Sequence, residues 1–158
     1  MPVGPYKDMA ACMAANQDKA DPKAFCAAME HRMKLAKLDQ ERQLVFGWAN
    51  VAVRKNGEVV TDHQGDQIDP TVLENAAYGF TLESGEGDEM HTATVRSHLV
   101  ESFMVTPDKL EAMGLAKNAL PLGWWVGFHV EDPQTWERVK AGELSMFSIA
   151  GVAEAVPA

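Results

Sequence analysis

The feature that most constrains how this chain can fold is a helix-start motif that recurs along it. Each occurrence places an Asp or Thr, whose side chain can cap a helix, directly before a proline, which suits the first helical position. They are Asp21-Pro22, Asp69-Pro70, Thr106-Pro107 and Asp132-Pro133. The residues that follow carry apolar side chains at helical spacing, and the last of these segments meets a plausible stop at Gly142. The pattern predicts short helices with strands between them.

Strand-like runs fill the intervals between these helices. They are LVFGWANVAVR, HLVESFMV, WWVGFHV and SMFSIAGVA, each bounded by Gly, Pro or charged residues. Asn56-Gly57 in the segment KNGE predicts a tight hairpin after the first of them. From about residue 43 onward the sequence therefore predicts an α+β fold: a mainly antiparallel sheet or barrel with short helices around it.

The first 40 residues differ in composition from the rest. They are rich in Ala, Met and Lys and are broken once, at ADP. We expect an N-terminal helical hairpin over residues 1–40 and a main domain over 41–158. The acidic, glycine-bearing stretch ESGEGDE at 83–89 predicts a mobile loop within that domain.

Charge and cysteine content exclude several classes of protein. With 14 basic and 23 acidic residues the formal net charge is −9, and no basic cluster is present to neutralise phosphates, so nucleic-acid binding is disfavoured. No apolar run approaches the ~20 residues that cross a bilayer. Cys12 and Cys26 are too few for a secreted disulfide framework. The sequence predicts a soluble protein of a reducing compartment, with both cysteines reduced and packed.

Metal and nucleotide sites find little support. Asp62, Asp66 and Asp69 lack the spacing of a calcium loop and its distal bidentate Glu. Cys12, Cys26 and His31 could supply zinc ligands, but no paired CxxC or HxxxH spacing accompanies them. Phosphate loops, GxSxG elbows and HExxH motifs do not occur. We expect no metal and no cofactor.

Two residues on predicted strands are candidates for chemistry. Strand alternation places Glu101 on the same face as Leu99 and Phe103, where a carboxylate needs a partner. Glu101 either lies on a solvated face, pairs with a nearby arginine, or orients a catalytic histidine. Ser148 is either a small strand residue or a nucleophile, and the small residues after it, Ala150 and Gly151, would leave backbone amides free to hold an oxyanion.

A serine nucleophile needs a base, and histidine is the usual one. His91 lies in EMHTATV, where the acidic loop passes into the next strand, and loops carried on a scaffold often bear working side chains. His98, at the start of that strand, is the competing candidate. The remaining three, His31, His63 and His129, are expected at the surface.

Over residues 43–153 the chain resembles the XkdF-type phage serine proteases, relatives of the prohead proteases of tailed bacteriophages. The motifs that carry the resemblance are VFGWANV, TDHQGDQIDP, GDEMH, LVESF, PLGWWVGFHV and MFSIAG, in that order. The resemblance implies a herpesvirus-protease-like barrel in which His91 and Ser148 form the catalytic pair. It also implies cleavage of phage scaffold and major capsid protein inside the assembling prohead, in the cytoplasm of a bacterial host, with a homo-oligomer as a sensible expectation.

One departure from the family pattern bears on the catalytic machinery. In prohead proteases the acidic third member of the triad lies on a strand well downstream of the serine, whereas this chain ends at Ala158. We therefore expect the protease-like domain to lack that C-terminal strand and Glu101, rather than Glu154, to substitute for the acid. The rival interpretation is a non-catalytic module with a protease-like fold that docks to capsid or scaffold.

Overall fold

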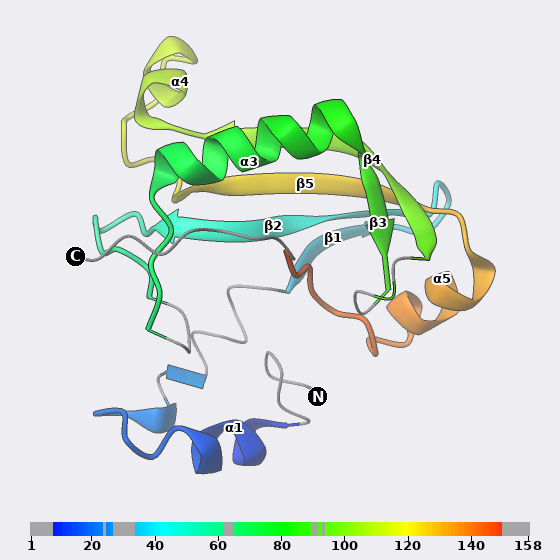
Figure 1. Ribbon diagram of the computed structural model, residues 1–158, viewed down its shortest axis with the longest axis horizontal. Coiled ribbons are helices and arrows are strands. Elements are labelled where there is room, and N and C mark those ends of the chain that lie inside the picture. The colour runs from blue at the N-terminus through cyan, green and yellow to red at the C-terminus, as the bar shows by residue number, and fades with distance from the viewer. Residues whose placement is uncertain are drawn as a thin grey trace.

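The computed structural model describes residues 8–23, 25–26, 34–61, 65–89, 92 and 94–149 (Figure 1). Its helices are α1 (Met9–Ala15), α3 (Pro70–Glu83), α4 (Pro107–Ala112) and α5 (Pro133–Lys140). Its strands are β1 (Leu35–Asp39), β2 (Leu44–Val53), β3 (Glu86–Asp88), β4 (Val95–Val105) and β5 (Leu122–Val130). Among the described residues, no helix has the length and apolar character that crossing a membrane requires.

The predicted helix starts are confirmed. Pro70, Pro107 and Pro133 open α3, α4 and α5, and residues 22–23 and 25–26 after Asp21 are helical. The Asp69 carboxylate accepts hydrogen bonds from the amides of Thr71 and Val72. Each aspartate cap satisfies amides that the first turn of a helix leaves without a partner.

The strands form one open antiparallel sheet in the order β1-β2-β5-β4-β3. The expected closed barrel is wrong, because β1 and β3 lie at opposite edges and do not pair with each other.

Two segments differ in secondary structure from the prediction. SMFSIAGVA forms no strand over its described residues and contributes only the bridge between Met146 and Lys34. The stretch 83–89, expected to be a loop, contains β3.

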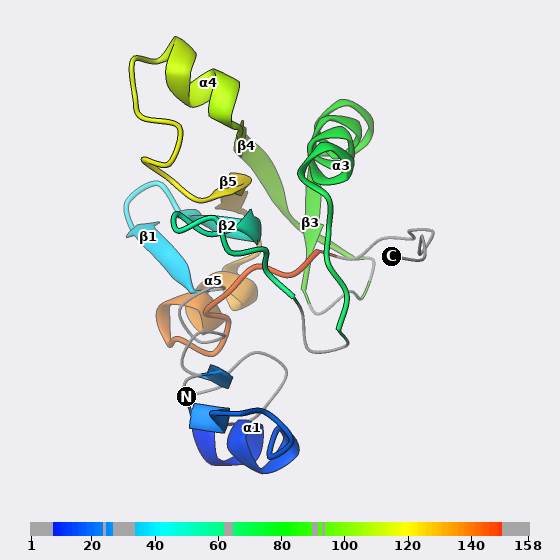
Figure 2. The ribbon, with the colours of Figure 1, turned by 90° about the vertical axis from the view of Figure 1, so that its left-hand side faces the viewer.

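One face of the sheet carries the core. Helix α3 lies along it (Figures 1 and 2), with Leu73 and Ala77 buried against Trp124 and Val126 of β5. Trp136 of α5 packs into the same cluster. The Asn56-Gly57 turn forms as predicted, since Val53 bridges Val59 across it. The rings of Phe80 and Trp124 meet edge to face, with centroids 5.5 Å apart.

A salt bridge ties α4 to α3. Lys109 Nζ donates to Glu74 Oε1 at 2.5 Å and to the Tyr78 hydroxyl at 2.6 Å. The hydrogen bond from Lys109, followed by the one from Tyr78, holds the pKa of the Glu74 carboxyl below its usual value. The contact fixes the start of α4 against the middle of the long helix.

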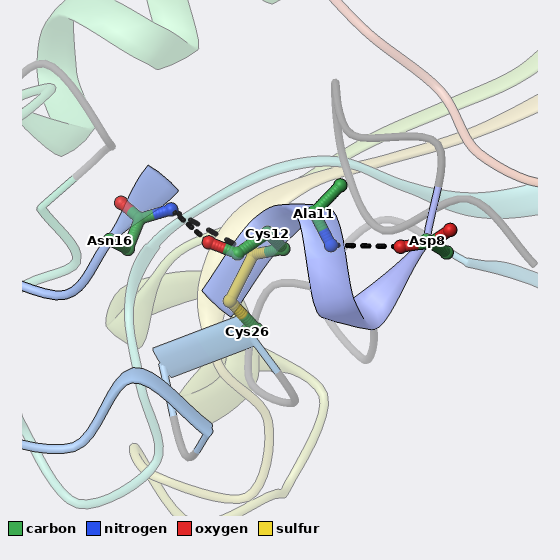
Figure 3. Close-up of a disulfide and its surroundings, with 5 residues drawn as sticks. All are labelled: Asp8, Ala11, Cys12, Asn16 and Cys26. Atoms are coloured by element: carbon green, nitrogen blue, oxygen red, sulfur yellow. Dashed lines mark hydrogen bonds between the residues drawn. A yellow bond between two sulfur atoms is a disulfide. The ribbon is translucent and has the colours of Figure 1, made fainter. Parts of the chain in front are cut away.

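The N-terminal region is held by a disulfide (Figure 3), so the expectation of two reduced cysteines is wrong. Cys12 and Cys26 are both fully buried and form a small cluster with Met9, Met13 and Phe25, apart from the main core. Asn16 Nδ2 donates to the Cys12 carbonyl oxygen at 2.8 Å and closes the end of α1. Strand β1 also lies inside residues 1–40, so the helical segment is shorter than expected.

Replacing both cysteines with serine is expected to unfold this N-terminal unit. Its helix is seven residues long, too short to persist alone, and its apolar cluster has the two sulfurs at its centre. Closing a loop across a separation of 14 residues contributes about 3 kcal/mol in the chain-entropy account. Hydrogen exchange should show fast exchange at the amides of residues 12 and 16 in the variant and unchanged protection in β5. Equal protection of residues 9–16 in parent and variant would contradict this.

Candidate active site

Ser148 lies in the segment that follows α5. Hydrogen bonding anchors this segment, because Leu35 N donates to the Ser145 carbonyl oxygen at 2.7 Å and Met146 bridges Lys34. The Phe147 ring packs on Phe128 of β5, with centroids 5.6 Å apart. Ser148 is exposed. The segment is therefore fixed to the core face of the sheet just before a serine that solvent can reach.

His91, Ala150 and Gly151 lie outside the described residues, so their predicted roles stay predictions. The residues on either side of positions 90 and 91 are described. Thr92 N donates to the Glu89 carbonyl oxygen at 3.2 Å. Glu89 Oε2 accepts a hydrogen bond from Thr135 Oγ1 at 3.0 Å, and Glu89 also pairs with Arg138. The end of β3 is thus fastened to α5.

The segments that precede positions 91 and 148 both lie beside Phe128 of β5. A Cβ built on Gly87 of β3 would lie 3.1 Å from Phe128 Cε1, so the strand that leads toward position 91 passes close over this ring. Phe147, which precedes Ser148, packs on the same ring. The chain therefore approaches positions 91 and 148 from residues that share Phe128 as a neighbour.

Glu101 lies elsewhere. It is exposed, and its Oε1 accepts a hydrogen bond from Trp125 Nε1 at 2.8 Å on the face of the sheet opposite the core. The reason is a β-bulge: Leu99 pairs with Phe128 and Glu101 with Gly127, which leaves Val100 as an extra residue. The structure does not bring Glu101 toward Phe147, and its role as a third catalytic member stays a prediction.

Two described histidines pair with one carboxylate on that same outer face. His98 Nε2 lies 3.4 Å from Glu131 Oε2, and His129 Nδ1 lies 3.7 Å from Glu131 Oε1. His98 and His129 are direct cross-strand neighbours. His98, the competing base, is therefore placed with Glu131 rather than with Phe147. His31 and His63 lie outside the described residues.

Metal ligation has no support within the described ranges, where no group of three or more His, Cys, Asp or Glu side chains could hold an ion. Asp69 caps α3. Asp62 falls outside the description, and the two cysteines are joined to each other.

A network at the start of α5 escaped the sequence analysis. Asp132 Oδ2 accepts from Thr135 N at 2.8 Å, and its Oδ1 accepts from Arg96 Nη1 at 2.9 Å. The hydrogen bond from the Thr135 amide, with Arg96 adding to it, holds the pKa of Asp132 below its usual value. Thr135 in turn donates to Glu89, so β3, β4 and α5 meet at one point. The Asp-Pro cap at 132 was the only signal of it.

Replacing Glu89 with alanine is expected to lower the free energy of unfolding by about 1–3 kcal/mol, because the buried Thr135 hydroxyl loses its acceptor. Urea denaturation followed by circular dichroism measures the change. Glu86→Ala is the matched control, since Glu86 is exposed and lies in the same strand. A Glu89→Ala variant as stable as Glu86→Ala would show that the contact does not fasten β3 to α5.

Comparison with known proteins gives the family. The family described as "Putative phage serine protease XkdF" matches residues 32–157. The phage-like element PBSX protein XkdF of Bacillus subtilis (strain 168) is 30% identical over 149 residues, which cover 89% of this chain and 50% of that protein. The uncharacterized protein YqbD of the same organism is 31% identical over 123 residues, or 77% of this chain and 35% of that protein.

The chain thus spans half or less of the length of these curated relatives. No solved structure matches it, so the expected likeness to herpesvirus proteases stays a prediction. The matched range includes both positions 91 and 148, and the described residues approach both of them around Phe128. This chain belongs to the XkdF family of phage serine proteases.

Proposed function

We propose that this chain is a serine endopeptidase in which Ser148 is the nucleophile and His91 the base. Family membership over residues 32–157 is the observation that carries the proposal. The anchoring of Phe147 on Phe128 and of Glu89 on α5 supports it, because a nucleophile and its base need segments held in fixed positions.

In the proposed mechanism, His91 accepts the hydroxyl proton of Ser148 as the serine oxygen attacks a peptide carbonyl carbon. Backbone amides at Ala150 and Gly151 would stabilise the oxyanion of the tetrahedral intermediate. His91 then gives the proton to the leaving amine, and an acyl-enzyme remains on Ser148. Water, deprotonated by His91, hydrolyses the ester and releases the second product.

The proposed substrates are phage scaffold protein and the removable segment of the major capsid protein. Cleavage would take place inside the assembling prohead, in the cytoplasm of the bacterial host. The proposal extends the family description, which names a phage serine protease, to a stage of phage assembly.

A second candidate function is a non-catalytic module that docks to capsid or scaffold. The observation that favours it is the outer face of the sheet, where Trp48 and Trp125 lie with ring centroids 5.5 Å apart and no described helix packs over them. A docking module does not need Ser148, whereas the endopeptidase does. A substitution at Ser148 therefore distinguishes the two functions.

Co-expression with cognate scaffold and capsid proteins tests the choice. The products are compared by mass spectrometry for the parent chain and for Ser148→Ala, with circular dichroism to check that both are folded. We expect cleaved products with the parent and intact proteins with the variant. Intact substrates with a folded parent that still binds them would favour the docking module, and identical cleavage by both chains would remove Ser148 from the mechanism.

A further inference from the structure

The outer face of the sheet has no part in the proposed protease activity. Strand register arranges its side chains in transverse rows across β1, β2, β5 and β4. One row runs Lys37, Phe46, Gly127, Glu101, and the next runs Trp48, Trp125, Phe103. The described helices that pack on the sheet, α3 and α5, join the core cluster on the opposite face. The view along the strands in Figure 2 shows α3 on one side of the sheet only.

The centre of this face is apolar, whereas the face of an antiparallel sheet that meets water is normally polar. Phe46, Trp48, Phe103 and Trp125 are all half-buried, each covered in part by its neighbours. Residue 127 must be small, because a Cβ there would lie 2.7 Å from two ring carbons of Phe46. Contiguous, partly exposed aromatic surface of this kind marks protein interfaces, and tryptophan is enriched at their energetic centres.

A hollow of about 460 Å³ lies in the same face, lined by Leu44, Phe46, Val100 and Trp125 together with charged groups. Arg42 on its rim is neutralised locally, since its Nε and Nη2 donate to Asp39 Oδ2 at 2.9 and 2.6 Å. The apolar surface therefore continues into a recess that a side chain from a partner can fill.

The two remaining charges of the hollow lie on opposite sides of its apolar centre. Lys37 is on the edge strand β1, with its Nζ 5.5 Å from the centre of the Phe46 ring, and Glu101 is on β4. Within the described part of the chain neither forms an ion pair. Both belong to one transverse row, with β2 and β5 between them.

We propose that a second copy of this chain covers this face, forming a two-fold dimer in which the two sheets pack face to face. A two-fold axis parallel to the strands, between Phe46 and Gly127, exchanges the two ends of the row. Lys37 of each copy then meets Glu101 of the other, and the aromatic rows meet across the axis. The charge complementarity is present within a single face, which is the requirement for self-association. The dimer is independent of the proposed protease activity.

Charge reversal tests the pairing in the full chain. Sedimentation equilibrium and light scattering from ~1 μM to ~1 mM protein should show a dimer for the parent. Lys37→Glu and Glu101→Lys should each raise the dimer dissociation constant by about tenfold or more, because each places like charges together twice. The double variant should restore dimerisation. Lys55→Glu, the same change of charge in an exposed turn, is the control.

Truncation of the aromatic centre gives a second, independent readout. Trp48→Ser should raise the dissociation constant by about thirtyfold or more, whereas Leu82→Ser, at an 86% exposed leucine on α3, should leave it unchanged. A parent that stays monomeric throughout would overturn the proposal and assign the face to a different polypeptide. A dimer that tolerates Trp48→Ser, or a double charge variant that stays monomeric, would also overturn it.

Discussion

Replacing Ser148 with alanine is expected to abolish peptide cleavage and labelling by a fluorophosphonate probe, which reacts covalently with an activated serine hydroxyl. Loss of the nucleophile in a serine protease lowers the rate by about 10⁴ to 10⁶-fold. His91→Ala should cause a loss of similar size, and the double variant should be little worse, because nucleophile and base act as one unit. The rate of probe labelling, followed by intact-protein mass spectrometry, measures all three.

Ser145→Ala is the matched control for this experiment. It makes the same substitution three positions earlier in the anchored segment, and the backbone hydrogen bond from Leu35 N to the residue 145 carbonyl oxygen remains possible. We expect its labelling rate to equal that of the parent. Labelling of a serine other than Ser148 in the folded parent, or equal labelling of parent and Ser148→Ala, would remove Ser148 from the mechanism.

Replacing Gly123 with alanine is expected to lower the free energy of unfolding by about 2–4 kcal/mol, although it adds only one methyl group. Gly123 lies in the central strand β5, and a Cβ there would meet the Asn50 carbonyl oxygen and lie 2.9 Å from Val51 Cα. These atoms belong to the backbone of β2, so no side-chain rotation relieves the overlap. Thermal and urea unfolding followed by circular dichroism measure the loss.

Gly79→Ala is the opposite case and serves as the control. Gly79 lies inside α3, and nothing is within 4 Å of a Cβ built there. Alanine in an open helical position should raise the free energy of unfolding by about 0.5–1 kcal/mol, because glycine loses more backbone freedom on folding. Equal effects at positions 79 and 123 would show that the close approach of β2 and β5 does not limit what position 123 accepts.

Much of the fold followed from local patterns. The Asp-Pro and Thr-Pro pairs located the starts of α3, α4 and α5, because capping and the fixed proline φ act within one turn of helix. The apolar runs located β2, β4 and β5. Closure of the sheet is a long-range property, and no local pattern reports which strands form its edges. The expected barrel was wrong for that reason.

The assignment of Glu101 to the same face as Leu99 shows where strand alternation fails. Alternation is reliable only while every residue pairs, and the extra residue Val100 reverses the facing of the later residues of β4. Glu101 and Phe103 consequently lie on the outer face, while Leu99 and Met104 pack in or against the core. The disulfide was not predicted for a different reason. The number of cysteines indicates only the redox compartment, whereas the bond between Cys12 and Cys26 depends on two helical segments meeting in space.

The proposed catalytic pair rests on resemblance to a family, and the contacts that support it are not visible in the sequence. Thr135 and Glu89 are separated by 46 positions and meet only because α5 packs beside the end of β3. A single threonine and a single glutamate give no periodic or spacing signal.

The strand order has a consequence for how quickly this chain reaches its native state. Strands β1 and β2 are joined by a short turn, and β3, β4 and β5 follow one another along the chain, so each group can form through nearby residues. The ladder between β2 and β5 instead joins residue 53 to 122 and residue 44 to 129. The entropy cost of closing so long a loop must be met before the β2–β5 contacts stabilise the chain. Pairing of β2 with β5 is therefore the slow step of folding. Substitutions along this ladder should therefore retard refolding, whereas those in the β1–β2 turn should mainly alter the rate of unfolding.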